Sequence, residues 1–197
     1  MEQSNRFPDA LAYAAALHVG QCRKLSGAPY VSHLLRVAGT VLEYGADEDE
    51  AIAALLHDAV EDQGGAQTRE AIRRRFGDRV AEIIDGCTDT DQHPKPPWQI
   101  RKEAFLKRLP DATPSVRLVV AADKLDNLRS LTNSYRQQGD EVWRGFKGGR
   151  DGTLWYHRSV VDILKQHGPG PLVEELERSL REFERLVEER RQPPLGG

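Results

Sequence analysis

Apolar side chains recur every three or four positions along almost the whole chain, and this spacing predicts α-helices. No stretch of alternating polar and apolar residues between turns predicts a convincing strand. The first helix is expected over residues 9–22, and a second begins at Pro29 and stops at Gly45. Asp47 and Glu50 have the spacing of a capping box, which predicts the start of a helix that runs through AIAALLHDAVED.

The rest of the chain continues the same pattern. The segments TREAIRRRFG and DRVAEIIDG predict two short helices, each ended by its glycine. A polar, proline-bearing loop is expected at residues 88–97, and a glycine-rich, basic loop at residues 144–152. Further helices are expected over WQIRKEAFLKRL, residues 115–135, TLWYHRSVVDILKQHG and the segment from Pro171. The fold class is therefore all-α, a helical bundle that we expect to form one domain over residues 1–197.

Charge and cysteine content narrow the function classes. The 197 residues carry 28 basic and 31 acidic side chains, so net charge gives no argument for duplex nucleic acid or an anionic membrane as the main partner. Cys22 and Cys87 form no CxxC pair, which favours small core residues over a disulfide framework or a structural zinc site. With no signal-peptide pattern and no apolar run of about 18 residues, we expect a cytoplasmic protein.

One short string combines a histidine with several acids inside an apolar helix. His57 and Asp58 follow AIAALL directly. Glu61 comes four residues after His57 and Asp62 four residues after Asp58, so each acid lies on the same helix face as its partner. Burying an imidazole beside a carboxylate is costly without a partner, and a bound cation would provide one. Negative charge at a helix C-terminus is disfavoured by the helix dipole, so the acidic pair also points to chemistry.

Two other apolar helices carry polar residues that packing does not explain. His33 lies on the helix after Pro29, and Asp123 interrupts the apolar run LVVAADKLDNL, with Asn127 four residues on. Two imidazoles and two carboxylates form a mixed nitrogen and oxygen set. Such a set suits Mn²⁺, Fe²⁺, Zn²⁺ or Mg²⁺ better than a thiophilic metal. Taken singly, each histidine could be structural; the four residues together predict a metal site.

These residues lie in motifs that resemble the HD superfamily of metal-dependent phosphohydrolases. More narrowly, the chain is similar to the (p)ppGpp hydrolase domain of the RelA/SpoT homologues, in particular the small alarmone hydrolases. The similarity spans about residues 9–135, and its motifs are QCRK with SGAPY and His33, HDAVED, an FG followed by GCT, and ADKLDNL. The resemblance implies an HD-domain helical bundle, and in it His33, His57, Asp58 and Asp123 would hold the metal.

The resemblance also implies the roles of the surrounding residues. Mn²⁺ would be the cofactor, and Glu61 and Asp62 would handle protons as catalytic groups. The substrate would be a 3′-pyrophosphorylated guanosine, hydrolysed without synthesis. Substrate contacts are expected from Arg23, Lys24, Asn127, Arg101, Lys102 and Tyr156. For Arg101 and Lys102 an exposed helix face remains an equal alternative.

Three departures from the family pattern keep other functions open. Leu34 replaces a proline after the first histidine, and the loop DQHPKPPW and the segment WRGFKGGRDGTLWY differ from the best-known members. A second hypothesis is therefore a phosphohydrolase for another nucleotide, such as a deoxynucleotide or NADPH. A third is a nucleotide-sensing module without catalysis. The apolar stripe of the last helix could pack on this domain or on a second copy, which leaves a homodimer open.

Overall fold

The computed structural model describes residues 5–92 and 94–191, and most of this part of the chain is helical. The only pairing of extended backbone in it is an isolated antiparallel bridge between Cys22 and Pro29. The elements in chain order are α1 Arg6–Leu17, α2 Val31–Glu43, α3 Glu48–Leu56, α4 Ala59–Asp62, α5 Gly65–Phe76, α6 Asp78–Cys87, α7 Trp98–Arg108, η1 Leu109–Asp111, α8 Pro114–Gln138, η2 Gly139–Gly145, α9 Gly149–His167 and α10 Pro171–Glu189. The predicted all-α class is confirmed.

Several predicted helix boundaries are confirmed by their local chemistry. Asp47 caps α3 through a capping box, in which its Oδ1 accepts from the Glu50 backbone N–H at 3.0 Å and the Glu50 side chain bonds back. Gly45 and Gly77 follow α2 and α5 with φ of 84° and 96°, the left-handed region that favours glycine. The last helix begins at Pro171, as expected.

Other boundaries differ from the prediction. α1 ends at Leu17, and the chain then turns at Gly20, whose φ is 77°, so the helix does not reach Cys22. Helix α6 does not stop at Gly86 but runs on to Cys87. Val116 of α8 packs against Gly86 and leaves no room for a side chain. An added Cβ would lie 2.4 Å from the Val116 Cγ2.

Two further corrections lie near the candidate chemistry. The predicted helix over AIAALLHDAVED breaks into α3 and α4, with Asp58 at φ −95° and ψ −4° between them. This is the bridge region of backbone space, in which many active-site residues lie. The expected glycine-rich loop at 144–152 is largely helical, because η2 extends to Gly145 and α9 already begins at Gly149.

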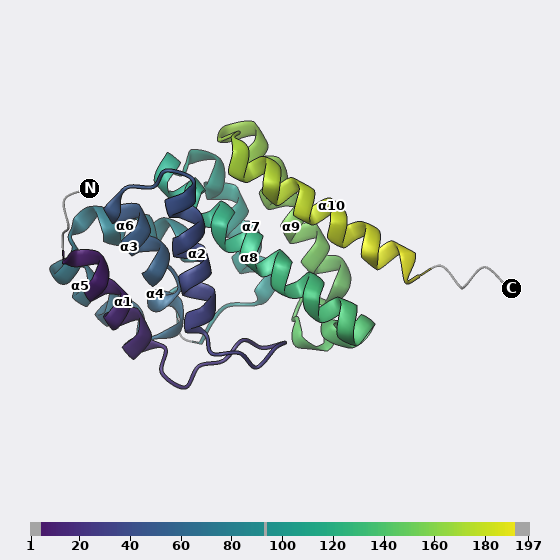
Figure 1. Cartoon of the computed structure of the whole chain (residues 1–197), viewed down its shortest axis with the longest axis horizontal. Coiled ribbons are helices and arrows are strands. Elements are labelled where there is room, and N and C mark those ends of the chain that lie inside the picture. The colour runs from purple at the N-terminus through teal and green to yellow at the C-terminus, as the bar shows by residue number, and fades with distance from the viewer. Residues whose placement is uncertain (1–4, 93, 192–197) are drawn as a thin grey trace, which may run out of the picture.

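The long helix α8 organises the core. It packs against α2, α3 and α6 on one side and against α9 and α10 on the other, and in Figure 1 it runs between these two groups of helices. The apolar stripe of α10 is buried within the chain, against α8 and α9, through Leu172, Leu176, Leu180, Phe183 and Val187. No helix among the described residues is long and apolar enough to cross a bilayer.

Two helix-interior glycines give a matched stability prediction. Gly86→Ala should destabilise the fold by about 1–3 kcal/mol, because the new Cβ meets both Cγ atoms and the Cβ of Val116 and no valine rotamer clears it. Gly39→Ala in α2 should instead stabilise by up to about 1 kcal/mol, since nothing lies within 4 Å of the position that the new Cβ would take. Urea unfolding of both variants measures the difference. Equal effects of the two substitutions would contradict the packing of α6 on α8.

Candidate functional site

Four side chains predicted as metal ligands converge where α2, the α3–α4 junction and α8 meet. His33 comes from α2, His57 and Asp58 from the junction, and Asp123 from α8. The candidate ligand atoms of His33, His57 and Asp58 lie within 4.8 Å of one another. The Asp123 Oδ1 lies 3.4 Å from the Nε2 of His33 and 3.7 Å from that of His57. The break in the helix at Asp58 aims its carboxylate at the same point, 3.1 Å from the His57 Nε2.

The chemistry of this donor set fits a divalent cation. His33 and His57 are fully buried or nearly so, and the Nε2 atom of each has no hydrogen-bond partner in the described structure. Buried polar atoms without partners are rare because each costs free energy. The Nδ1 of each ring is already used, by Asp126 for His33 and by the backbone carbonyl of Ala54 for His57. Each Nε2 is therefore left to face the carboxylates, as a metal ligand would.

The pKa values of these groups depend on one another. Burial alone would lower the pKa of His33, but Asp123, Asp126 and Asp58 outweigh burial and raise that pKa to about 9. Burial is likewise overcome at Asp58, where the neighbouring histidines hold the pKa well below its usual value. At Asp123, Lys124 chiefly outweighs the effect of burial and holds the pKa of this carboxyl well below its usual value. Both carboxylates are thus ionised, as ligands of a cation must be.

Neighbouring side chains hold the two carboxylates in place. The Tyr30 hydroxyl donates to the Asp58 Oδ2 at 2.5 Å, and the Asn127 amide donates to the Asp123 Oδ1 at 2.5 Å. The Lys124 ammonium donates to the Asp123 Oδ2 at 2.6 Å. Each carboxylate therefore has one position fixed by the protein before any ion is bound.

The acidic pair Glu61 and Asp62 lies on α4, one turn beyond the candidate ligands. The Lys95 ammonium bridges the two acids, 2.9 Å from the Glu61 Oε1 and 3.1 Å from the Asp62 Oδ1. Burial, together with the charge of Asp89, raises the pKa of Glu61, while Lys95 opposes that rise. A carboxyl with a raised pKa is better suited to exchange protons near neutral pH.

Asp89 organises the basic pair of α7. Its buried carboxylate accepts two hydrogen bonds from Arg101 Nη1, at 2.6 and 2.7 Å, and one from Lys102 at 2.7 Å. Although burial disfavours its charge, Lys102 and Arg101 hold the pKa of Asp89 at about 2. Arg101 also lies 3.5 Å from Glu61, so this pair faces the acids and is not simply an exposed helix face.

One cavity of about 600 Å³ is lined by the two carboxylates of the candidate ligand set, by the acidic pair, and by Asp89 with its basic partners. The other predicted substrate contacts line it as well. Arg23 donates to the Asn127 Oδ1 at 2.9 Å, Lys24 is exposed at the rim, and the buried ring of Tyr156 lies under Lys102, 4.7 Å from its ammonium. The structure thus brings the predicted site residues to one place, from α2, α4, α7, α8, α9 and the turn after α1.

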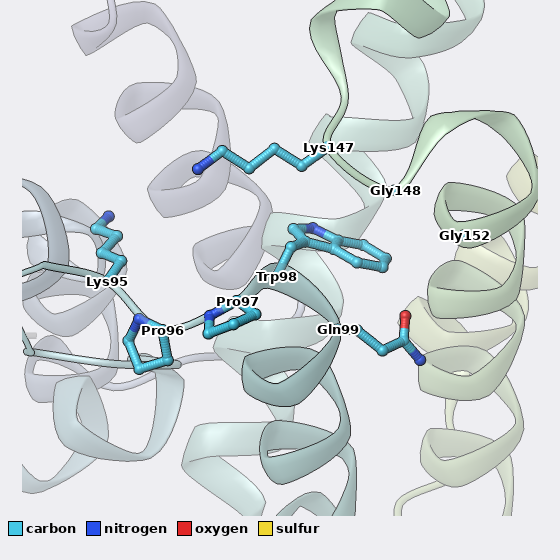
Figure 2. Close-up of a pocket in the computed structure, with 8 residues that line it drawn as sticks. All are labelled: Lys95, Pro96, Pro97, Trp98, Gln99, Lys147, Gly148 and Gly152. Carbon is cyan, nitrogen blue, oxygen red and sulfur yellow. The ribbon is translucent and has the colours of Figure 1, made fainter.

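A second cavity of about 630 Å³ opens beside the first (Figure 2) and shares Lys95, Trp98 and Lys147 with it. Its described lining holds two lysines and no carboxylate. The glycine-rich segment forms its wall, because a Cβ on Gly148 or Gly152 would lie only 2.7 or 3.2 Å from the Trp98 ring. Two segments unlike the family pattern therefore meet at Trp98.

Several residues of the site were not found by sequence reasoning. Lys95 and Asp89 belong to a segment expected to be an ordinary loop, and Lys124 was not among the predicted site residues, although its largely buried side chain donates to Asp123. Asp126 was passed over, although it bonds to His33. Only Asp126 gave a usable signal: like Asp123, it is a carboxylate in an apolar stretch of the same helix.

Comparison with known proteins places the chain among HD domains. A family model described as an HD domain matches residues 10–154. The human guanosine-3′,5′-bis(diphosphate) 3′-pyrophosphohydrolase MESH1 is 36% identical over 172 residues, covering 81% of this chain and 93% of the human protein. A pyrophosphohydrolase of the same description from Aquifex aeolicus is 38% identical over 122 residues.

The match to the Aquifex protein covers 62% of this chain but 17% of the relative, so the chain spans about a sixth of that protein's length. One solved structure, described as a metazoan orthologue of SpoT that hydrolyses ppGpp, superposes with a TM-score of 0.75. It is 29% identical, with 92% of this chain and 97% of the other covered. The similarity to the two animal-type proteins therefore extends over nearly their whole length.

The bridge from Lys95 to the acidic pair predicts a pH effect. In Lys95→Gln the group that lowers the pKa of Glu61 is lost, so this pKa rises further above its usual value. If ionised Glu61 accepts a proton in the reaction, the acidic limb of the kcat/KM profile should move to higher pH. Lys107→Gln, an exposed lysine of the same region, serves as control and should leave the limb in place. An unmoved limb in Lys95→Gln would argue against Glu61 as the base.

Proposed function

The chain belongs to the HD domain family, and from this premise we propose that it is a metal-dependent phosphohydrolase that releases pyrophosphate from the 3′ position of ppGpp or pppGpp. The observation that carries the proposal is the pair of buried imidazole Nε2 atoms without partners, facing two ionised carboxylates. The similarity to proteins named for this reaction supports the choice of substrate.

The proposed cofactor is a divalent metal ion, Mn²⁺ in the first instance, held by His33, His57, Asp58 and Asp123. Such an ion activates a water molecule and offsets the charge of a phosphate oxygen. The protein supplies the geometry, since Tyr30 and Asn127 each hold one carboxylate oxygen. A mixed nitrogen and oxygen donor set accepts Fe²⁺, Zn²⁺ and Mg²⁺ as well.

The proposed proton transfers use the acidic pair. Hydrolysis adds a water oxygen to the phosphorus of the 3′-diphosphate and breaks its bond to the ribose 3′ oxygen, which needs a proton as it leaves. Glu61, with its raised pKa, would take the proton of the attacking water at Oε1 and pass it to the ribose 3′ oxygen as that oxygen leaves. Asp62, joined to it through Lys95 and held by Gln21 at 3.0 Å, would keep that carboxylate and its proton in position.

The proposed substrate contacts are the cations and the amide on the cavity wall. Arg101 and Lys102 are positioned by Asp89 and would meet the pyrophosphate. Arg23 can stack on a base or bond to phosphate, and Asn127 can bond to a ribose hydroxyl. Tyr156 would close the inner wall. Lys24, which lies at the rim, would bind a substrate phosphate that extends out of the cavity.

Pyrophosphate release from ppGpp tests this function directly. With Mn²⁺, the protein should produce pyrophosphate and GDP, and Asp58→Ala or His57→Ala should reduce kcat/KM by more than about 100-fold because a ligand is lost. Removal of the metal with EDTA should abolish turnover, and restored Mn²⁺ should recover it. At about 100 times its Kd, Mn²⁺ should also stabilise the wild-type fold by about 2.7 kcal/mol. Intact Mn²⁺ binding without any turnover of ppGpp would refute the substrate assignment.

The second cavity favours a second candidate substrate. Lys147 lines both cavities and has no ion-pair partner among the described residues. The described lining of the second cavity carries no carboxylate that would repel an anion. A nucleotide such as NADPH or a deoxynucleoside triphosphate could place one of its phosphates past Trp98, near Lys147 (Figure 2). The same metal and the same acids would then act on a different phosphate ester.

A panel of nucleotides separates the two candidates. ppGpp, pppGpp, NADPH and a deoxynucleoside triphosphate are compared by kcat/KM with Mn²⁺, with phosphate and pyrophosphate measured separately. For the first candidate we expect pyrophosphate release from the two guanosine substrates at a kcat/KM at least tenfold above the others. A higher value for NADPH, with phosphate as product, would establish the second candidate instead.

A further inference from the structure

Asp126 on α8 is a buried carboxylate outside the predicted set of ligands. It is 4% exposed, and its Oδ2 lies 2.6 Å from the Nδ1 of His33. Arg36 Nε donates to its Oδ1, and Arg36 Nη2 approaches its Oδ2 at 3.4 Å. A second guanidinium, that of Arg23, lies 3.8 Å from the same Oδ2. Both guanidiniums at Asp126 can only donate hydrogen bonds, which favours its ionised form as an acceptor.

This surrounding decides which nitrogen of His33 carries the proton. A carboxylate can only accept, so the Nδ1 of the neutral ring must be the N–H that points to Asp126. The Nε2 then keeps its lone pair, and it is the atom that lies 3.4 Å from Asp123 and 3.6 Å from Asp58. A lone pair at that position is what coordination of a cation needs.

We propose that Asp126 is a positioning residue that, held by Arg36, fixes the tautomer and orientation of His33 and thereby raises the affinity of the site for its divalent metal. The inference rests on the proposed role of His33 as a ligand. It assigns to Asp126 no contact with the metal or the substrate. It also explains a buried acid that packing does not require.

The substitution Asp126→Asn tests this more sharply than removal of the side chain. An amide must place its NH₂ group against one of the donors. The guanidinium of Arg36 cannot stop donating, whereas an imidazole can move its proton from Nδ1 to Nε2. The amide NH₂ therefore settles against His33, whose Nε2–H then faces the ligand position and blocks coordination. Asp126→Ala removes the same charge but lets water accept from Nδ1, so the productive tautomer survives.

Mn²⁺ affinity, measured by calorimetry on the metal-free full chain, is the readout. We expect Asp126→Asn to raise the Kd by about 10- to 100-fold. The Kd of Asp126→Ala should lie above that of wild type, because the tautomer is no longer fixed, and at least threefold below that of Asp126→Asn. Asp162→Asn, an exposed acid of α9 with the same change in charge, should stay within twofold of wild type. Melting temperatures of the metal-free proteins show whether each variant is folded.

The outcomes are decisive in either direction. A Kd for Asp126→Asn within twofold of wild type overturns the proposal, and so does an Asp126→Ala protein that binds as weakly as the Asn form. If Asp126→Asn does not fold, a Kd of Asp126→Ala equal to that of wild type overturns it instead. Because the readout is metal binding, failure here differs from failure of the proposed function, which would appear as absent turnover in a wild-type protein that binds Mn²⁺.

Discussion

The rest of this structure depends on one constraint: two buried imidazoles place their unpartnered Nε2 atoms next to two carboxylates. The carboxylates lie 3.1 to 3.7 Å from the Nε2 atoms of His33 and His57, and neither nitrogen has a hydrogen-bond partner among residues 5–92 and 94–191. An arrangement of this kind is costly to bury by itself, and a cation removes the cost by serving all four groups together. The helix break lies at Asp58, whose carboxylate is 3.1 Å from the His57 Nε2.

Helix α8 combines the core and the site in one element. Val119, Val120, Leu125 and Leu128 are buried in the core, while Asp123 and Asp126 face the two histidines from the same helix. Because α2, α3 and α6 pack on one side of α8 and α9 and α10 on the other, the helix cannot shift without disturbing the core. The position of Asp123 relative to His33 is thus set by the packing of apolar side chains that take no part in the chemistry.

The sequence predicts those parts of the molecule that depend on local periodicity and on types of residue that do not belong in a core. The all-α class followed from apolar spacing, and His33, His57, Asp58 and Asp123 were identified because polar groups in apolar helices need a reason. The groups it missed are paired across long stretches of chain: Lys95 bridges to Glu61, Asp89 to Arg101, and Asp126 to His33. Lys124 gave no signal because a lysine usually lies on the surface, whereas this one is largely buried and donates to Asp123. Gly86 was read as a helix stop because glycine usually is one, and only the position of Val116 shows its other use.

The charges that line the cavity also bear on the order in which a metal ion and a phosphate would bind there. Its described lining carries the carboxylates of Asp58, Glu61, Asp62, Asp89 and Asp123, and five of the seven cations there already pair with carboxylates of the protein: Arg23, Lys95, Arg101, Lys102 and Lys124. A phosphate entering this cavity alone would face the ionised carboxylates of Asp58 and Asp123 at its centre, of which Asp123 is paired with Lys124. On the proposed function, a divalent cation bound first would offset these carboxylates, and pairs such as Lys95 with Glu61 could then exchange partners toward the substrate. Metal and substrate would therefore favour each other's binding through the charges of the cavity.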